Sequence, residues 1–223
     1  MSIPAPKTRW DIRKLLGLFG YCKLWLYQYT QSVKFLYDKL VNPEPVRWTT
    51  EDEEQLQELK DKLSSTPVLS LPDLKKGFEF FVNTEKGIAY GVLTQEWRGS
   101  KKPVAFLSKL LDPVARGWPT CLQVIAATAI LLEEAQKLTL QGKIRIHTPH
   151  DLKMVLSHKA QQWLTDSQIL KYEIMACKRH LVTKILAPGG CPENPTDTGQ
   201  LGKRKKGAST MQAMNYMSVQ KKE

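Results

Sequence analysis

Basic side chains near the N-terminus are the residues whose type and spacing best suit ligand binding. They are Lys7, Arg9, Arg13 and Lys14, followed by Lys23 and Trp25. Cationic groups close to an aromatic ring suit contacts with the phosphates, sugars and bases of a nucleic acid. The alternative is that the cations are solvated while the apolar residues among them form a small core. Those apolar residues are Leu15, Leu16, Phe19 and Trp25.

Candidates for catalysis are scarce. His147 and His150 form an H-x-x-H pair, but two imidazoles without a carboxylate or thiol partner are a weak zinc signal, so a polar loop is favoured. The four cysteines are far apart and form no C-x-x-C pair, which argues against a disulfide framework or a zinc knuckle. No serine, cysteine or histidine lies in a recognised nucleophile motif. We expect neither a bound metal nor covalent catalysis.

The net charge of +11 comes from the two ends of the chain. Residues 1–48 carry 8 Lys and Arg against 3 Asp and Glu, and residues 178–223 carry 9 against 3. Residues 49–177 carry 16 of each. A basic segment attracts nucleic acid through counterion release, although a solvated surface has the same composition.

Segment 188–223 differs from the rest, because its Pro, Gly and polar content is typical of disorder. Its basic run is a short candidate for nuclear import or nucleic-acid contact, formed by Lys203, Arg204, Lys205 and Lys206. The longest apolar run, 124–132, is too short to cross a bilayer, and the N-terminus has no secretory signal. We expect an intracellular protein, cytoplasmic or nuclear, without a membrane partner.

The elements that position these residues change in kind along the chain. Residues 1–66 have helical patterns, with capping signals at Thr8 and at Thr50-Glu-Asp-Glu53 and apolar periods over 12–26 and 30–40. Gly17 and Gly20 weaken the first helix and suit close packing against another backbone. Beyond residue 67, strands alternate with helices, which predicts a mixed α/β (α+β) sheet with helices on its faces. The strands are expected at 78–82, 88–94, 103–108, 144–147 and 180–186, and the helices at 121–138, 151–157 and 165–177.

This strand and helix order, and many ordered strings, resemble the region after the palm of gammaretrovirus-like (endogenous retroviral) Pol reverse transcriptases. The strings include LGLFGYCKLW at 16–25, TPVLSLPD at 66–73, FEFFV at 78–82, GVLTQ at 91–95 and PVAFLSK at 103–109. The resemblance covers roughly residues 3–186. It implies a helical thumb-like region at 1–66 and a ribonuclease H-like connection domain at 67–187. The basic tail from 188 to 223 does not follow the pattern.

The resemblance also implies where catalytic carboxylates would stand. Active ribonucleases H clamp two metal ions with an Asp on the first strand, a Glu on the long helix and an Asp after the fourth strand. Asn83, Gln123 and Pro149 occupy these positions here, and none supplies a carboxylate. The nearest acids are Glu79, on the same strand face, and Asp151, which suits a helix cap. The Asp-Asp pair of the polymerase site is absent from the sequence.

The expected function is therefore non-specific binding of RNA–DNA hybrid or duplex nucleic acid, without polymerase or ribonuclease H activity and without a cofactor. Lys101 and Lys102 flank the third strand and would add backbone contacts. One alternative is a module that packs against other Pol domains through exposed Trp10, Trp25 and Trp48. A second is a residual Mg²⁺-dependent ribonuclease H.

Overall fold

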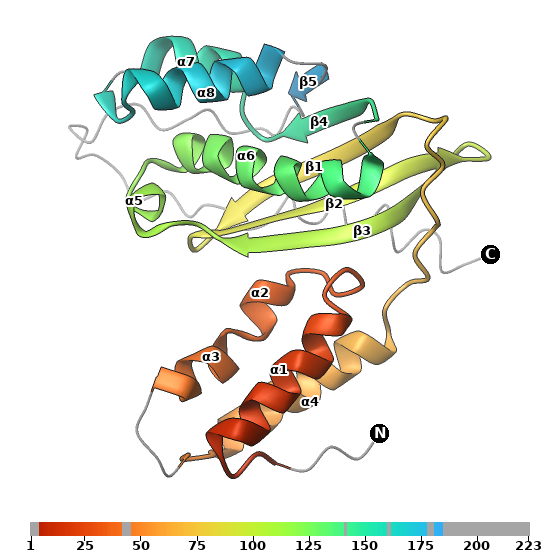
Figure 1. Cartoon of the computed structure of the whole chain (residues 1–223), viewed down its shortest axis with the longest axis vertical. Helices are drawn as coiled ribbons and strands as arrows, with labels where there is room; N and C mark the ends of the chain where they lie inside the picture. The colour runs from red at the N-terminus through yellow and green to blue at the C-terminus, as the bar shows by residue number, and fades with distance from the viewer. Residues whose placement is uncertain (1–4, 42–45, 141, 160–161, 178–180, 185–223) are drawn as a thin grey trace, which may run out of the picture.

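A computed structural model describes residues 5–41, 46–140, 142–159, 162–177 and 181–184. Its N-terminal part contains four helices, α1 (Arg9–Tyr21), α2 (Tyr29–Ser32), α3 (Lys34–Val41) and α4 (Thr50–Ser64). They lie together on one side of the sheet domain (Figure 1). They share a hydrophobic cluster made of Ile12, Leu15, Phe19, Leu26, Val33, Leu36, Leu56 and Leu59.

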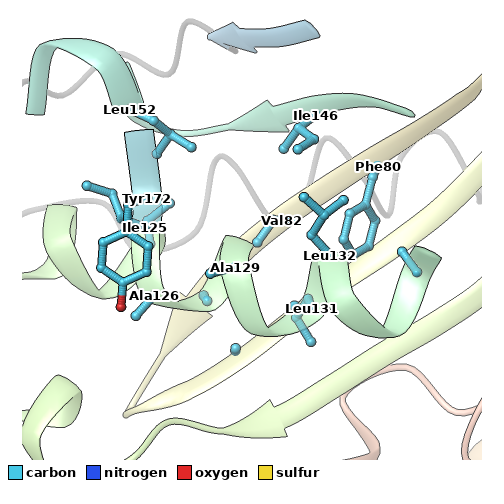
Figure 2. Packing of buried hydrophobic residues seen from close by; sticks show 14 of the residues in the cluster. Phe80, Val82, Ile125, Ala126, Ala129, Leu131, Leu132, Ile146, Leu152 and Tyr172 are labelled. Carbon is cyan, nitrogen blue, oxygen red and sulfur yellow. The ribbon is translucent and has the colours of Figure 1, made fainter. Parts of the chain in front are cut away.

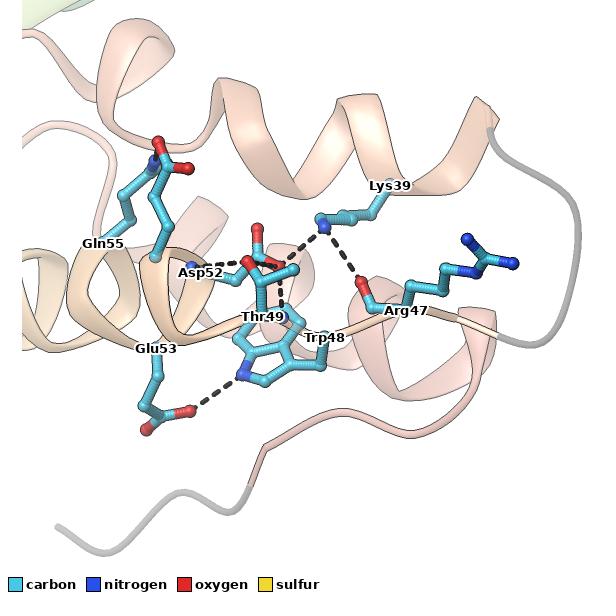
Figure 3. Close-up of polar contacts among 8 residues, drawn as sticks. Lys39, Arg47, Trp48, Thr49, Asp52, Glu53 and Gln55 are labelled. Atoms are coloured by element: carbon cyan, nitrogen blue, oxygen red, sulfur yellow. Dashed lines mark hydrogen bonds and ion pairs between the residues drawn. The ribbon is translucent and has the colours of Figure 1, made fainter.

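Two of these helices begin with a capping box, in which a Thr hydroxyl and an Asp carboxylate satisfy backbone N–H groups reciprocally. Thr8 and Asp11 cap α1, as predicted. The box of α4 is formed by Thr49 and Asp52, so the predicted box starting at Thr50 is wrong by one residue (Figure 3). The Lys39 ammonium contacts the Asp52 carboxylate, and this contact from α3 favours the observed register.

The first two predicted helices are shorter or more broken than expected. Helix α1 ends at Tyr21 rather than continuing to Leu26, and the single helix predicted over 30–40 is divided into α2 and α3 at Val33. Gln28, just before α2, has φ +53° and redirects the chain. Predicted close packing at Gly17 is not found, because no described atom beyond its chain neighbours and the adjacent helix backbone lies within 4 Å of a Cβ placed there.

The C-terminal part is built on a five-stranded mixed sheet of order β3-β2-β1-β4-β5. Strands β1 (Phe78–Glu85), β2 (Ile88–Trp97) and β3 (Ser100–Leu110) form an antiparallel meander. Strands β4 (Ile144–Thr148) and β5 (Leu181–Lys184) continue it in parallel beyond β1. The remaining helices are α5 (Pro113–Arg116), α6 (Thr120–Thr139), α7 (Leu152–Lys159) and α8 (Asp166–Cys177).

Helix α6 lies across the sheet and buries most of its length. Phe80 and Val82 of β1 point toward its Ile125, Ala129 and Leu132 (Figure 2). Because side chains alternate along a strand, the odd-numbered residues of β1 lie on the opposite face. None of the described helices is long and apolar enough to cross a membrane.

The helical part packs against the meander on the face opposite α6. The Tyr27 ring makes edge contacts with Tyr90 of β2 and Phe106 of β3, at centroid distances of 5.8 and 5.9 Å. The edge strand β3 also donates the Phe106 N–H to the Leu24 carbonyl at 2.8 Å. Its Pro103 carbonyl accepts from the Ser70 N–H at 2.8 Å. These bonds satisfy backbone groups that an edge strand would otherwise expose.

Candidate nucleic-acid interface

One side of α1 is exposed and carries aromatic and cationic groups. Its buried side is formed by Ile12, Leu15 and Phe19, which recur at helical spacing. The other side presents Trp10, 61% exposed, and Tyr21, 81% exposed. Gly17 lies between them along the helix. With no described atom near it, the helix backbone at Gly17 is open to an approaching ligand.

Lys14 is held over the Trp10 ring. Its ammonium lies 3.0 Å from the ring centroid and 3.9 Å from the carboxylate of Asp11. Hydrogen bonds from the Thr8 hydroxyl and backbone hold the pKa of Asp11 below its usual range. The single carboxylate of the first turn is thus committed to the cap. Arg13, also exposed, has no ion pair within the described residues.

The remaining predicted N-terminal contacts are less uniform. Lys7 is exposed just before α1, Arg9 is half-buried, and Lys23 is exposed in the turn after the helix. Trp25 is 39% exposed and does not belong to the core, whereas Leu15 and Phe19 do. The alternative that the apolar residues form a small core therefore holds for the apolar side of α1, but not for Trp25.

The predicted contacts Lys101 and Lys102 lie within β3 and not on the helical part. Lys101 points to the sheet face opposite α6, where its ammonium is 2.6 Å from the Glu79 carboxylate. Lys102 is half-buried and pairs with Gln95 in the strand register. These two lysines therefore belong to the sheet, whereas the other predicted contacts lie on or next to α1.

Glu79 is a partly buried acid on the sheet face opposite α6. Although burial raises its pKa, the hydrogen bond and charge of Lys101 outweigh burial and hold the pKa below its usual range. His147 of β4 lies 3.2 Å from Glu79 and stacks on Phe81, with centroids 4.6 Å apart. Burial lowers the pKa of His147, with Glu79 acting against it. Glu79 is thus an ion-pair partner in this structure.

The three positions aligned with catalytic carboxylates belong to different elements, namely β1, α6 and the end of β4. Asn83 lies on the β1 face opposite α6, and its side-chain oxygen accepts from the Thr84 N–H at 2.8 Å. Gln123, in the first turn of α6, donates to the Arg116 and Trp118 carbonyls at 3.0 and 2.8 Å. Pro149 follows the end of β4.

The Asp151 side chain and the His150 backbone carbonyl have structural roles after β4. Asp151 caps α7, because its carboxylate accepts from the Met154 N–H at 3.2 Å. The His150 carbonyl accepts from the Thr148 hydroxyl at 2.6 Å, which closes the turn after β4. No cluster of three His, Cys, Asp or Glu side chains suited to a metal occurs among the described residues. The basic run 203–206 lies outside them.

The same fold and sequence pattern occur in retroviral polyproteins. Residues 48–146 match the RNase H-like domain found in reverse transcriptase. The Gag-Pol polyprotein of avian reticuloendotheliosis virus is 43% identical over 176 residues, covering 78% of this chain and 15% of that protein. That of koala retrovirus is 41% identical over 173 residues, covering 78% of this chain and 10% of that protein. The chain is homologous to a segment of gammaretroviral Gag-Pol.

Solved structures agree with this homology at the level of the fold. A foamy viral protease-reverse transcriptase in complex with double-stranded DNA has a TM-score of 0.74 and 18% identity, covering 85% of this chain and 34% of that chain. The same type of protein in complex with an RNA/DNA hybrid has a TM-score of 0.72 and 18% identity, covering 92% of this chain and 28% of that chain. The predicted ribonuclease H-like α/β fold and Pol resemblance are confirmed. The chain spans about 10–15% of the length of these polyproteins, and the domain limits at 66 and 187 stay predictions.

Proposed function

We propose that this chain binds RNA–DNA hybrid or duplex nucleic acid without sequence preference, and that it does so through the exposed side of α1. The observation that carries the proposal is the combination on one helix side of Trp10, Lys14, the open backbone at Gly17 and Tyr21. Cations neutralise backbone phosphates, while aromatic rings pack on sugars or bases. The open glycine leaves room for a sugar–phosphate backbone to approach closely.

The proposal includes no nuclease or polymerase reaction by this chain. Two-metal hydrolysis needs several carboxylates around both ions. Asn83 and Gln123 offer neutral amides on different elements, and the Glu79 carboxylate is paired with Lys101. Binding without cleavage is therefore the function that these side chains support.

A fluorescence anisotropy titration with a labelled RNA–DNA hybrid tests this proposal. The wild-type chain should bind with an affinity that falls steeply as salt rises. The double variant Arg13→Ala/Lys14→Ala should lower the salt slope by about two units, one for each lost phosphate contact. The matched control is Lys34→Ala/Lys62→Ala, which removes the same charge from exposed sites on α3 and α4.

The comparison between the two double variants decides the outcome. Equal losses in both would mean that net charge alone governs binding and would refute the assigned surface. An unchanged slope in the α1 variant would refute it too. Scrambling the hybrid sequence should leave the affinity unchanged.

A second candidate function is protein–protein contact with other Pol domains. Val68 and Leu71, in the segment joining α4 to β1, are 92% and 91% exposed. Exposed apolar side chains of this kind often mark interfaces. Salt-insensitive association that is lost in Val68→Ser/Leu71→Ser, together with no hybrid binding, would favour this function over the first.

A further inference from the structure

A pocket of about 320 Å³ opens at the end of the sheet where β1 turns into β2. It is formed where the β1–β2 turn meets the end of α5 and the first turn of α6, which follow each other about 30 residues later in the sequence. Its lining consists of Thr84, Glu85, Lys86, Gly87, Arg116, Thr120 and Gln123. The α1 surface contributes no residue to this lining, so this pocket is a separate place on the molecule.

The Thr84 hydroxyl is the group that indicates a ligand in this pocket. Its side chain lies on the α6 side of β1 and is only 8% exposed. Its hydroxyl nevertheless has no hydrogen-bond partner among the described residues. A buried hydroxyl without a partner is costly, and native proteins rarely contain one. A polar group bound in the pocket that Thr84 lines would supply the partner.

The N-terminus of α6 adds a positive electrostatic field to the pocket. This helix is 20 residues long, and its N-cap is Pro119, which provides no side-chain cap. Its first turn contains no acidic residue. By contrast, α1, α4 and α5 are capped by the side chains of Thr8, Thr49 and Asp112. The first turn of an uncapped helix favours an anion through its N–H groups and dipole.

The charged side chains around the pocket are suited to the same ligand. Arg116 and Lys86 have no ion pair among the described residues, and Glu85 is the one carboxylate on the lining. The Arg116 stem lies over Gly87, where a Cβ in place of the glycine hydrogen would stand 2.8 Å from the stem carbons. Because Gly87 has no Cβ and adopts φ +74°, the aliphatic part of the Arg116 side chain packs against the turn. Two cations against one anion disfavour a divalent metal and favour an anion.

We propose that this pocket binds a phosphate group, with the Thr84 hydroxyl, the Arg116 guanidinium and the first turn of α6 as its donors. The phosphate belongs either to a nucleic-acid backbone or to a free phosphate compound, and both present the same tetrahedral anion. This proposal does not rest on the α1 surface, because inorganic phosphate can test the pocket without a duplex.

The first experiment titrates the full 223-residue chain with sodium phosphate at constant ionic strength and follows its melting temperature and ³¹P line width. The wild-type melting temperature should rise saturably, because a ligand of the folded state stabilises it. Arg116→Gln should weaken phosphate binding about tenfold by removing a charge-assisted hydrogen bond. The matched control is Arg98→Gln, an exposed arginine at the opposite end of β2, which should bind as the wild type does.

Thr84→Val separates binding from structural damage. Without phosphate, this variant should be at least as stable as the wild type, because a methyl group replaces an unpartnered hydroxyl. It should then lose most of the phosphate-dependent shift, and Thr84→Ser should recover it. The proposal is overturned if the wild type shows no saturable shift, or if the shift persists in both Arg116→Gln and Thr84→Val.

Hybrid binding by Arg116→Gln and Arg98→Gln shows whether the phosphate comes from a nucleic-acid backbone or from a free phosphate compound. If a backbone phosphate occupies the pocket, Arg116→Gln lowers the salt slope by about one unit relative to Arg98→Gln. If the slope is unchanged while inorganic phosphate still binds the wild type, the ligand is a free phosphate compound. Loss of hybrid binding in the α1 variant leaves the phosphate titration unaffected, so the two proposals fail separately.

Discussion

The ammonium of Lys39 lies 2.6 Å from the carboxylate of Asp52, and both side chains are largely removed from solvent. This ion pair joins the end of α3 to the start of α4 (Figure 3). Although burial raises the pKa of Asp52, hydrogen bonds from Lys39 and Thr49 outweigh it and hold the pKa below its usual range. Asp52→Asn should therefore destabilise the chain by about 3 kcal/mol, since it leaves a buried cation without its partner. Urea unfolding at pH 7 measures this loss.

Glu53→Gln provides the control for that prediction. Glu53 accepts from the Trp48 indole N–H at 2.8 Å, but it is exposed. Its replacement should cost less than about 1 kcal/mol. If Glu53→Gln cost more than Asp52→Asn, the capping box would start at Thr50 after all.

Gly17→Ala should change stability and binding in opposite directions. The site has room for a methyl group, and alanine should stabilise the exposed helix by about 1 kcal/mol. The same methyl group stands where a sugar–phosphate backbone is proposed to approach, so hybrid affinity should fall severalfold. Gln57→Ala on α4 should leave the affinity unchanged. A more stable Gly17→Ala chain with wild-type affinity would refute close approach at this helix side.

Glu134 makes α6 sensitive to acid. Hydrogen bonds from Lys109 and Lys137 lower its pKa from 4.5 to about 2. A carboxylate with a lowered folded-state pKa stabilises the fold above its unfolded value, and this stabilisation is lost as the pH falls from 4.5 toward 2. Glu134→Gln should cost about 1 kcal/mol at pH 7, because both lysines are solvent-screened. Its unfolding free energy should vary less with pH in that window than that of Glu54→Gln.

Tyr27 should dominate the contact between the helical part and the sheet. Tyr27→Ala removes a ring that meets Tyr90 and Phe106, and should cost about 3 kcal/mol. Burial raises the pKa of Tyr27, with Tyr90 and Glu85 adding to it. Stability should therefore decline as the pH rises above 10, where the unfolded phenol ionises and the folded one does not. Tyr27→Phe should retain the packing and lessen this alkaline decline, as urea unfolding at pH 7 and at about pH 10.5 would show.

Local sequence signals predict a helix start correctly only where they allow a single position for the capping box. Thr8 is followed three residues later by Asp11, and no neighbouring threonine offers a second capping box, so the predicted box is the observed one. Thr49 and Thr50 both have one, so the local rule allows two registers. The choice between the two registers depends on the contact of Lys39 with Asp52. This is a tertiary contact, which spacing along the chain does not reveal. Helix α5 is not among the predicted helices, although Asp112 followed by Pro113 is a cap and first-turn signal.

The sheet was easier to predict than the sites on it. Strands that alternate with a long apolar helix predict a sheet covered by a helix. The alternation along β1 also predicts the observed face for Glu79. Its ion pair with Lys101 joins residues 22 positions apart and does not follow from any local pattern. Thr84 and Arg116 likewise carry no signal in the sequence, because only the folded chain brings the β1–β2 turn to the start of α6.

The hydrogen bonds that Leu24 and Ser70 make to β3 have a consequence for any shortened version of this protein. A sheet expressed without its helical part would present the Phe106 N–H and its neighbours as an open template for a strand of another molecule. Such a fragment should recruit copies of itself edge to edge and precipitate. In the intact chain, the N-terminal helices therefore also protect the sheet against self-assembly.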